Sequence, residues 1–189
     1  MSRTPKLVAF AGSTRERSFN RQLAAAAAEI AGARGADVEL IELRDLEMPL
    51  FSEDLEAKGT PENATAFKGK LKAADGFLIA SPEYNSSYPA LLKNAIDWAS
   101  RPGDGEPMLA AFTGKACGLL AASPGGLGGM RMLPQLRLLL SSIGVHVVPA
   151  QFGLGSAHEA FDGDGKLVDD RAIKGVTRVV EQTIEIAGR

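Results

Sequence analysis

Cysteine is nearly absent from this sequence, with Cys117 the single one among 189 residues. One cysteine excludes a disulfide within the chain and any zinc or iron–sulfur site built only from cysteines. Long apolar runs are also missing, since none approaches the ~20 residues of a membrane-spanning helix. The run at 7–11 is too short for a signal-peptide core. We therefore expect a cytoplasmic protein with no membrane segment.

An excess of one charge is lacking too, because 21 basic and 23 acidic residues leave a net charge of −2. Without a polybasic block, nucleic acid is not an expected partner. The two histidines, His146 and His158, have no carboxylates at ligand spacing, so we expect no metal site. Residues 162–166 resemble a calcium loop, but Lys166 and the lack of a closing glutamate favour a simple turn.

Short apolar runs alternate with helical patterns along the chain. The runs predict buried strands at 7–11, 77–80, 116–121 and 145–148, and one nearer a sheet edge at 38–41. The helical patterns cover 19–33, 61–73, 89–100, 133–142 and 169–187. This alternation predicts an α/β fold, a doubly wound five-stranded parallel sheet with helices on both faces. No linker divides the chain, so we expect a single domain over residues 1–189.

The loop after the first strand, residues 12–20, combines glycine, hydroxyl side chains and positive charge where a helix begins. Ser13, Ser18 and Asn20 offer hydrogen bonds, Arg15 adds charge, and the helix N-terminus supplies free N–H groups. These features favour a phosphate, although helix capping by Ser18 and solvated arginines would explain the same residues without a ligand. Neither GxGxxG nor the Walker pattern is present, so a mononucleotide such as FMN fits better than NAD or ATP.

Two later loops follow strands of the same predicted sheet. In residues 81–89, Pro82 stiffens the backbone and Tyr84 offers an aromatic face, which together suit a flat heterocycle. In residues 123–131, four glycines in five positions permit either close approach of the backbone to a ligand or a mobile loop. Ligands of open parallel sheets bind at the carboxyl ends of the strands, so we expect the three loops to meet there.

Taken together, three segments resemble the NADPH-dependent FMN reductase family, which includes FMN-dependent quinone, chromate and azo-dye reductases. The segments are Gly12-Ser13-x-Arg15-x-x-Ser18-x-Asn20, Pro82-Glu83-Tyr84-Asn85 and Leu92-Lys93-Asn94-Ala95-Ile96-Asp97-Trp98. The match runs from residue 7 to about 149, and Ala90 departs from it where many relatives have glycine. The resemblance implies a flavodoxin-like fold with strand order 2-1-3-4-5 and FMN at the carboxyl edge of the sheet.

The resemblance also implies which residues bind the cofactor. It places Ser13, Arg15, Ser18 and Asn20 on the FMN phosphate, and Phe19 with them in the binding site. It places Pro82, Glu83, Tyr84 and Asn85 along the isoalloxazine ring, with Ser123 and Gly126 flanking it. Homodimers or homotetramers are implied as well, with the segment 91–98 at or near the interface.

The expected function is an FMN-dependent NAD(P)H oxidoreductase in which the cofactor carries the chemistry and no side chain is catalytic. NADPH or NADH gives a hydride, and a small-molecule acceptor takes electrons at the same face, which predicts ping-pong kinetics. Quinones, free flavin, metal oxyanions and azo compounds are the expected acceptors. The alternatives are a flavodoxin-type electron carrier, disfavoured by the small net charge, and a flavin-binding sensor with little turnover. Whether Arg17 or Arg131 contacts ligand stays open.

Several residues outside these loops have plainer expectations. Cys117 lies in a strand pattern and is expected to be a buried hydrophobic residue without a redox role. Trp98 is expected in the core or at an interface, and Lys93 and Asp97 are spaced to pair on one helix face. Arg101 follows that helix as a candidate interface residue.

Overall fold

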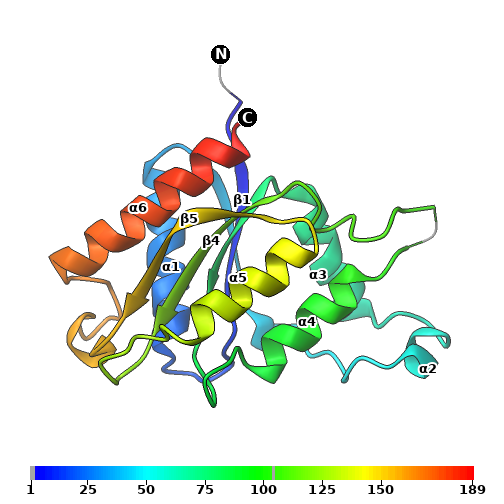
Figure 1. The fold of residues 1–189 in the computed structure, drawn as a ribbon, viewed down its shortest axis with the longest axis horizontal. Helices are drawn as coiled ribbons and strands as arrows, with labels where there is room; N and C mark the ends of the chain where they lie inside the picture. Colours follow the sequence, from blue (N-terminus) through cyan, green and yellow to red (C-terminus); the bar gives the residue numbers. More distant parts are fainter. Residues whose placement is uncertain (1–2, 104) are drawn as a thin grey trace.

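A computed structural model describes residues 3–103 and 105–189, and a parallel five-stranded sheet forms its centre (Figure 1). The strand order is β2-β1-β3-β4-β5, which confirms the predicted order. The strands are β1 (Lys6–Ala11), β2 (Asp37–Ile41), β3 (Gly76–Ala80), β4 (Ala116–Ala122) and β5 (His146–Leu154). All neighbouring strands pair in parallel.

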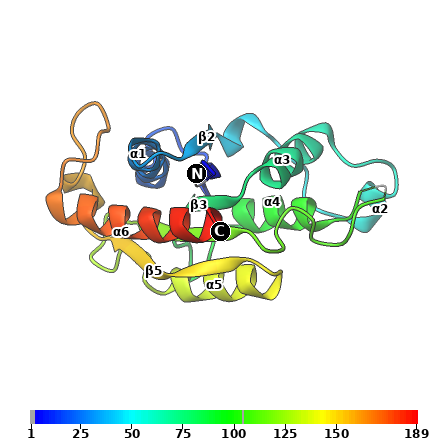
Figure 2. The same cartoon turned by 90° about the horizontal axis from the view of Figure 1, so that it is seen from above.

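Helices cover both faces of the sheet, as predicted. They are α1 (Phe19–Ala33), α3 (Glu62–Ala73), α4 (Ala90–Ser100), α5 (Met132–Ser142) and α6 (Asp170–Ala187), with short turns at α2 (Glu53–Glu56), η1 (Leu43–Asp45) and η2 (Ala157–Glu159). One core cluster joins the sheet to α1 and α6, which lie side by side, and the other joins it to α3, α4 and α5 (Figure 2). In the described part of the chain, no helix combines the length and apolar character that a membrane crossing demands.

The period of two along a strand explains how β1 serves both cores. Leu7 and Ala9 pack into the cluster with α1 and α6, whereas Val8 and Phe10 pack into the opposite cluster. In β4, a Cβ on Gly118 would lie 2.5 Å from the Thr183 hydroxyl, so this glycine lets α6 pack directly on the sheet. Such two-sided burial is why the sequence shows nearly continuous apolar strands.

The last strand is longer than the sequence predicted. The apolar run ends at Val148, but β5 continues through Pro149 to Leu154 after a shift of register against β4. A proline is tolerated because β5 is an edge strand. The Arg137 guanidinium donates hydrogen bonds to the carbonyls of Val147 and Val148 at the irregularity. This extension carries the end of β5 to the same edge as the predicted binding loops.

The structure also shows where the residues outside the three loops lie. Cys117 is fully buried, and burial raises the pKa of its thiol. Trp98 lies in the core, where its ring nitrogen donates to the Pro49 carbonyl at 2.7 Å. Lys93 and Asp97 pair at 2.7 Å. Arg101 hydrogen-bonds Glu56 at 2.8 Å within the same chain.

Candidate functional site

The three predicted loops meet in one cleft at the carboxyl edge of β1, β3 and β4. The cleft has a volume of about 130 Å³. The expected residues that line it are Ser13, Arg15, Ser18, Phe19, Asn20, Pro82, Glu83, Tyr84 and Ser123. Two expected residues lie outside this lining: Asn85 is at the tip of a turn, and Gly126 faces a separate hollow beyond the glycine-rich loop.

The phosphate loop, residues 12–20, has the geometry of an anion site. Ser18 is the N-cap of α1, and its Oγ accepts a hydrogen bond from the backbone N–H of Arg21 at 3.4 Å. The capping interpretation is therefore correct, and the Ser18 hydroxyl proton remains available to a ligand. The side chains of Ser13 and Ser18 are buried, whereas the Arg15 guanidinium is exposed and lies 5.7 Å from the centre of the Phe19 ring.

Arg21 holds the backbone of the phosphate loop in place, a role that we did not predict from the sequence. Its Nη1 donates to the carbonyls of Glu16 at 2.9 Å and Arg15 at 3.4 Å. Its Nε donates to Glu42 at 2.7 Å, and this hydrogen bond raises the pKa of the Arg21 guanidinium. An arginine at the third position of the helix, with an acidic residue directly after β2, was the available signal.

Asn20 joins the phosphate loop to the end of β4. Its amide nitrogen donates to the Ala122 carbonyl at 2.8 Å, and its amide oxygen accepts from the Ala122 N–H at 2.8 Å. The side chain is buried, and one amide hydrogen is left over for a ligand. Asn20 therefore fixes the distance between the first loop and the glycine-rich loop.

The ring loop, residues 81–88, ends in a tight two-residue turn. Tyr84 and Ser87 exchange backbone hydrogen bonds of 2.9 and 3.0 Å. Asn85 and Ser86 both have positive φ, a conformation that asparagine adopts readily. Gln135 on α5 accepts from the Ser87 hydroxyl at 2.8 Å and donates to the Ser86 carbonyl. The exposed Tyr84 ring is therefore held on a fixed support beside the cleft.

Glu83 binds the start of α5. Its carboxylate accepts from the backbone N–H groups of Arg131 and Met132 at 3.1 and 3.2 Å, and from Nε of Arg131 at 2.6 Å. Burial alone would raise the pKa of Glu83, but the hydrogen bonds with Arg131 and Met132 outweigh it, so the net pKa is lowered. Arg131, whose role the sequence left open, is thus the partner of Glu83 in this structure.

The glycines of the glycine-rich loop, residues 123–130, differ in the reason for which the fold needs them. A Cβ on Gly128 would lie 2.7 Å from the backbone of Gly153, and one on Gly129 would lie 2.5 Å from Ala121. Both glycines have positive φ, so they serve the packing of the loop on the sheet. A Cβ on Gly126 would meet nothing within 4 Å. Packing therefore explains Gly128 and Gly129, whereas Gly125 and Gly126 are the glycines of this loop that could serve the close approach of a ligand.

The residues of the cleft fit FMN. Two buried hydroxyls, an arginine and a helix N-terminus suit a phosphate with two negative charges. The cleft is smaller than a whole cofactor site, so its volume suits the phosphate end of a mononucleotide and not the entire molecule. Among residues 3–103 and 105–189, no three or more His, Cys, Asp or Glu side chains are grouped to hold a metal ion.

Fold and site thus define a flavodoxin-like flavoprotein of the oxidoreductase class, and comparisons with known proteins identify its family. The model of the NADPH-dependent FMN reductase family matches residues 5–159. An NAD(P)H-dependent FMN reductase of Pseudomonas aeruginosa is 39% identical over 91% of this chain and 89% of its own. A quinone reductase of Pseudomonas putida is 36% identical over 89% and 88%. The FerB flavoenzyme of Paracoccus denitrificans, an NAD(P)H:(acceptor) oxidoreductase, superposes with a TM-score of 0.83 at 29% identity, covering 97% of both chains.

The chain belongs to the NADPH-dependent FMN reductase family. It is an oxidoreductase that uses FMN and NAD(P)H, as the sequence predicted.

Proposed function

We propose that this enzyme transfers electrons from NADPH or NADH, through bound FMN, to quinones in the first place. Free flavin, metal oxyanions and azo compounds are the further proposed acceptors. The quinone reductase of Pseudomonas putida, 36% identical, and an NAD(P)H:quinone oxidoreductase of Solanum tuberosum, 39% identical, support the quinone assignment. The observation that carries the proposal is the meeting of three loops at one sheet edge, with the buried hydroxyls of Ser13 and Ser18 beside a helix N-terminus.

In this proposal, each loop holds one part of the cofactor. Ser13, Ser18 and Arg15 bind the phosphate, and Asn20 adds its free amide hydrogen while it holds the loop to β4. Pro82 to Asn85 and Ser123 to Gly126 face the ring from two sides. Phe19 packs beside the phosphate loop, where its ring stacks on Phe161 at 6.2 Å.

Bound FMN would supply the redox chemistry that links a nicotinamide hydride donor to the acceptor. The chain needs no acid–base pair for this chemistry. Glu83 is the carboxylate in the cleft lining, but Arg131 and the start of α5 occupy its oxygens and its pKa is lowered. It therefore holds no proton near neutral pH, and solvent supplies the protons. The cleft is open beside Tyr84, so donor and acceptor would use the same face of the flavin ring one after the other. This order of binding gives ping-pong kinetics.

The assembly and location follow the same family pattern in this proposal. The protein forms a homodimer or homotetramer in the cytoplasm, with the segment 91–98 near the interface. Within that segment Trp98 is buried in its own chain, whereas Leu91 is only half-buried. Leu91 is thus an apolar side chain of this segment that a partner chain would cover.

Steady-state kinetics with a benzoquinone and each nicotinamide tests the proposal. Double-reciprocal plots at several quinone concentrations are expected to be parallel. Intersecting lines would show that the nicotinamide and the quinone bind together, and would exclude one shared face of the flavin. Absence of turnover with every small acceptor, despite bound FMN, would favour the electron carrier or the sensor.

A further inference from the structure

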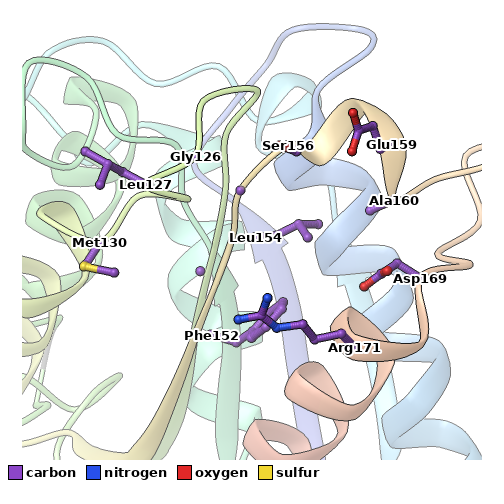
Figure 3. A pocket seen from close by; sticks show the side chains of 12 residues that line it. Gly126, Leu127, Met130, Phe152, Leu154, Ser156, Glu159, Ala160, Asp169 and Arg171 are labelled. Carbon is purple, nitrogen blue, oxygen red and sulfur yellow. The ribbon is translucent and has the colours of Figure 1, made fainter.

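A second hollow lies on the far side of the glycine-rich loop, at the end of β5 (Figure 3). It has a volume of about 420 Å³, which falls in the range of small-molecule sites. The extended end of β5 forms its floor, and the glycine-rich loop forms one wall. The opposite wall is built by η2 and the first turn of α6. None of the phosphate-loop residues lines it, so it is separate from the cleft described above.

The two walls differ in chemistry. Leu127 and Met130 on the glycine-rich loop are apolar side chains with 54% and 64% of their surface exposed. Facing them are Arg171, Asp169 and Glu159 (Figure 3). The Phe152 ring on the floor is fixed, because a Cβ on Gly175 of α6 would lie only 2.3 Å from it. A flat apolar group with attached anionic and hydroxyl groups would match these surfaces.

The glycine-rich loop borders both spaces, because Ser123 and Pro124 line the cleft whereas Gly126 and Leu127 line the hollow. Gly126 lines the hollow, and its loop also flanks the proposed ring position. Gly126 has neither a positive φ nor a neighbour that a Cβ would meet, so the fold itself does not require glycine there. A side chain at this exposed position would stand between the two spaces. Its absence lets an elongated ligand lie across the loop.

We propose that the hollow binds the adenosine diphosphate half of the nicotinamide donor, and that it favours NADH over NADPH. This inference rests on the proposed function, in which the nicotinamide lies over the flavin. The adenine lies between Leu127, Met130 and Phe152, and Arg171 binds the pyrophosphate.

Glu159 sets the preference in this arrangement. A carboxylate accepts hydrogen bonds from the ribose hydroxyls of NADH and repels the 2′-phosphate of NADPH. Asp169 adds negative charge, although its Oδ1 is engaged as the N-cap of α6, where it accepts from Ala172 at 2.6 Å. Two carboxylates and one guanidinium thus line the hollow, so a further phosphate is unfavourable there.

ADP-ribose separates this inference from catalysis, because it contains the adenosine and both phosphates but no nicotinamide. Its binding to the FMN-loaded enzyme is measured by calorimetry, for wild type and for Arg171→Gln. The loss of a charge-assisted contact is expected to weaken binding about tenfold. Lys174→Gln is the matched control, since Lys174 is an exposed cation one turn along α6 that does not line the hollow. It is expected to bind as wild type does.

The donor preference is tested with 2′-phospho-ADP-ribose in parallel. Wild type is expected to bind ADP-ribose more tightly, and Glu159→Gln to reduce that preference about tenfold. Asp170→Asn is the control, because it removes the same charge from an exposed position outside the lining. Equal affinity of all variants, or no binding of ADP-ribose by an enzyme that NADH does reduce, would overturn the inference. Binding that depends on Arg171 in a protein that neither nicotinamide reduces would instead contradict the proposed function.

Discussion

Replacing Glu83 with alanine is expected to loosen two of the three binding loops at once. The carboxylate joins the ring loop to the start of α5 through two backbone N–H groups and the Arg131 side chain. Only 8% of the Glu83 side chain is exposed, so water does not readily replace these bonds. Both Tyr84 and the glycine-rich loop depend on this attachment. Flavin affinity is therefore expected to fall together with stability.

The size of the expected stability loss follows from the groups that the Glu83 carboxylate binds. Loss of a helix cap costs ~1 kcal/mol, and hydrogen bonds to a charged group contribute ~1.5–3 kcal/mol. The ion-pair contribution is small, since 59% of the Arg131 side chain is exposed. We expect Glu83→Ala to lower the free energy of unfolding by about 2–3 kcal/mol, and Glu83→Gln by about 1 kcal/mol, because the amide keeps an acceptor oxygen.

Urea denaturation at a fixed FMN concentration measures this effect, because bound ligand itself adds stability. Glu185→Ala is the matched control: Glu185 also pairs with an arginine, Arg189, but both side chains are mostly exposed. Its loss is expected to cost less than ~0.5 kcal/mol. Equal effects of the two alanine variants would show that Glu83 does not stabilise the protein more than an exposed ion pair does.

The pH dependence has a definite sign. Because the pKa of Glu83 is lowered in the folded protein, its contribution is fully present above the ordinary glutamate pKa of ~4.3. The contribution is lost as the pH falls through that value towards the lowered pKa. The stability difference between wild type and Glu83→Gln is therefore expected to shrink below pH ~4.

Three further predictions follow from single contacts. Arg21→Gln removes the bonds to the Arg15 and Glu16 carbonyls, so FMN affinity should fall several-fold in a fluorescence titration while riboflavin, which lacks the phosphate, binds unchanged. Gly128→Ala should cost ~1–3 kcal/mol in urea denaturation, because its Cβ would meet the β5 backbone, whereas Gly126→Ala should cost less than ~0.5 kcal/mol; similar losses would contradict the packing described. Cys117 is buried and its thiol pKa is raised, so it should react with a thiol reagent only as fast as the chain unfolds; rapid labelling of the native protein would refute this.

The sequence predicted most of the fold because the signals were local. The apolar runs of β1, β3 and β4 are continuous and are followed by turn residues, and the predicted helix at 19–33 coincides with α1. The end of β5 was missed because Pro149 and Gln151 interrupt its apolar pattern, and the structure compensates through Arg137 and the edge position. Hydrogen bonds between separate segments, such as those of Arg137 with β5, leave no periodic apolar pattern in the sequence.

The same distinction applies to the site. The loops and their meeting point were predictable from residue type and from their position after strands. The attachments between loops, such as Glu83 to Arg131 and Asn20 to Ala122, join residues 48 and 102 positions apart. Two of the four glycines proved to serve contacts with the sheet, which composition alone could not distinguish from ligand approach.

An anaerobic absorption spectrum of the purified protein, before and after addition of NADH or NADPH, tests whether the protein binds FMN and reduces it with a nicotinamide. We expect flavin bands near ~450 nm, from FMN bound at this edge of the sheet, and we expect them to bleach on addition of a nicotinamide. A colourless protein that takes up no added FMN would contradict the assignment of the cleft. A yellow protein that neither nicotinamide bleaches would contradict the proposed electron transfer.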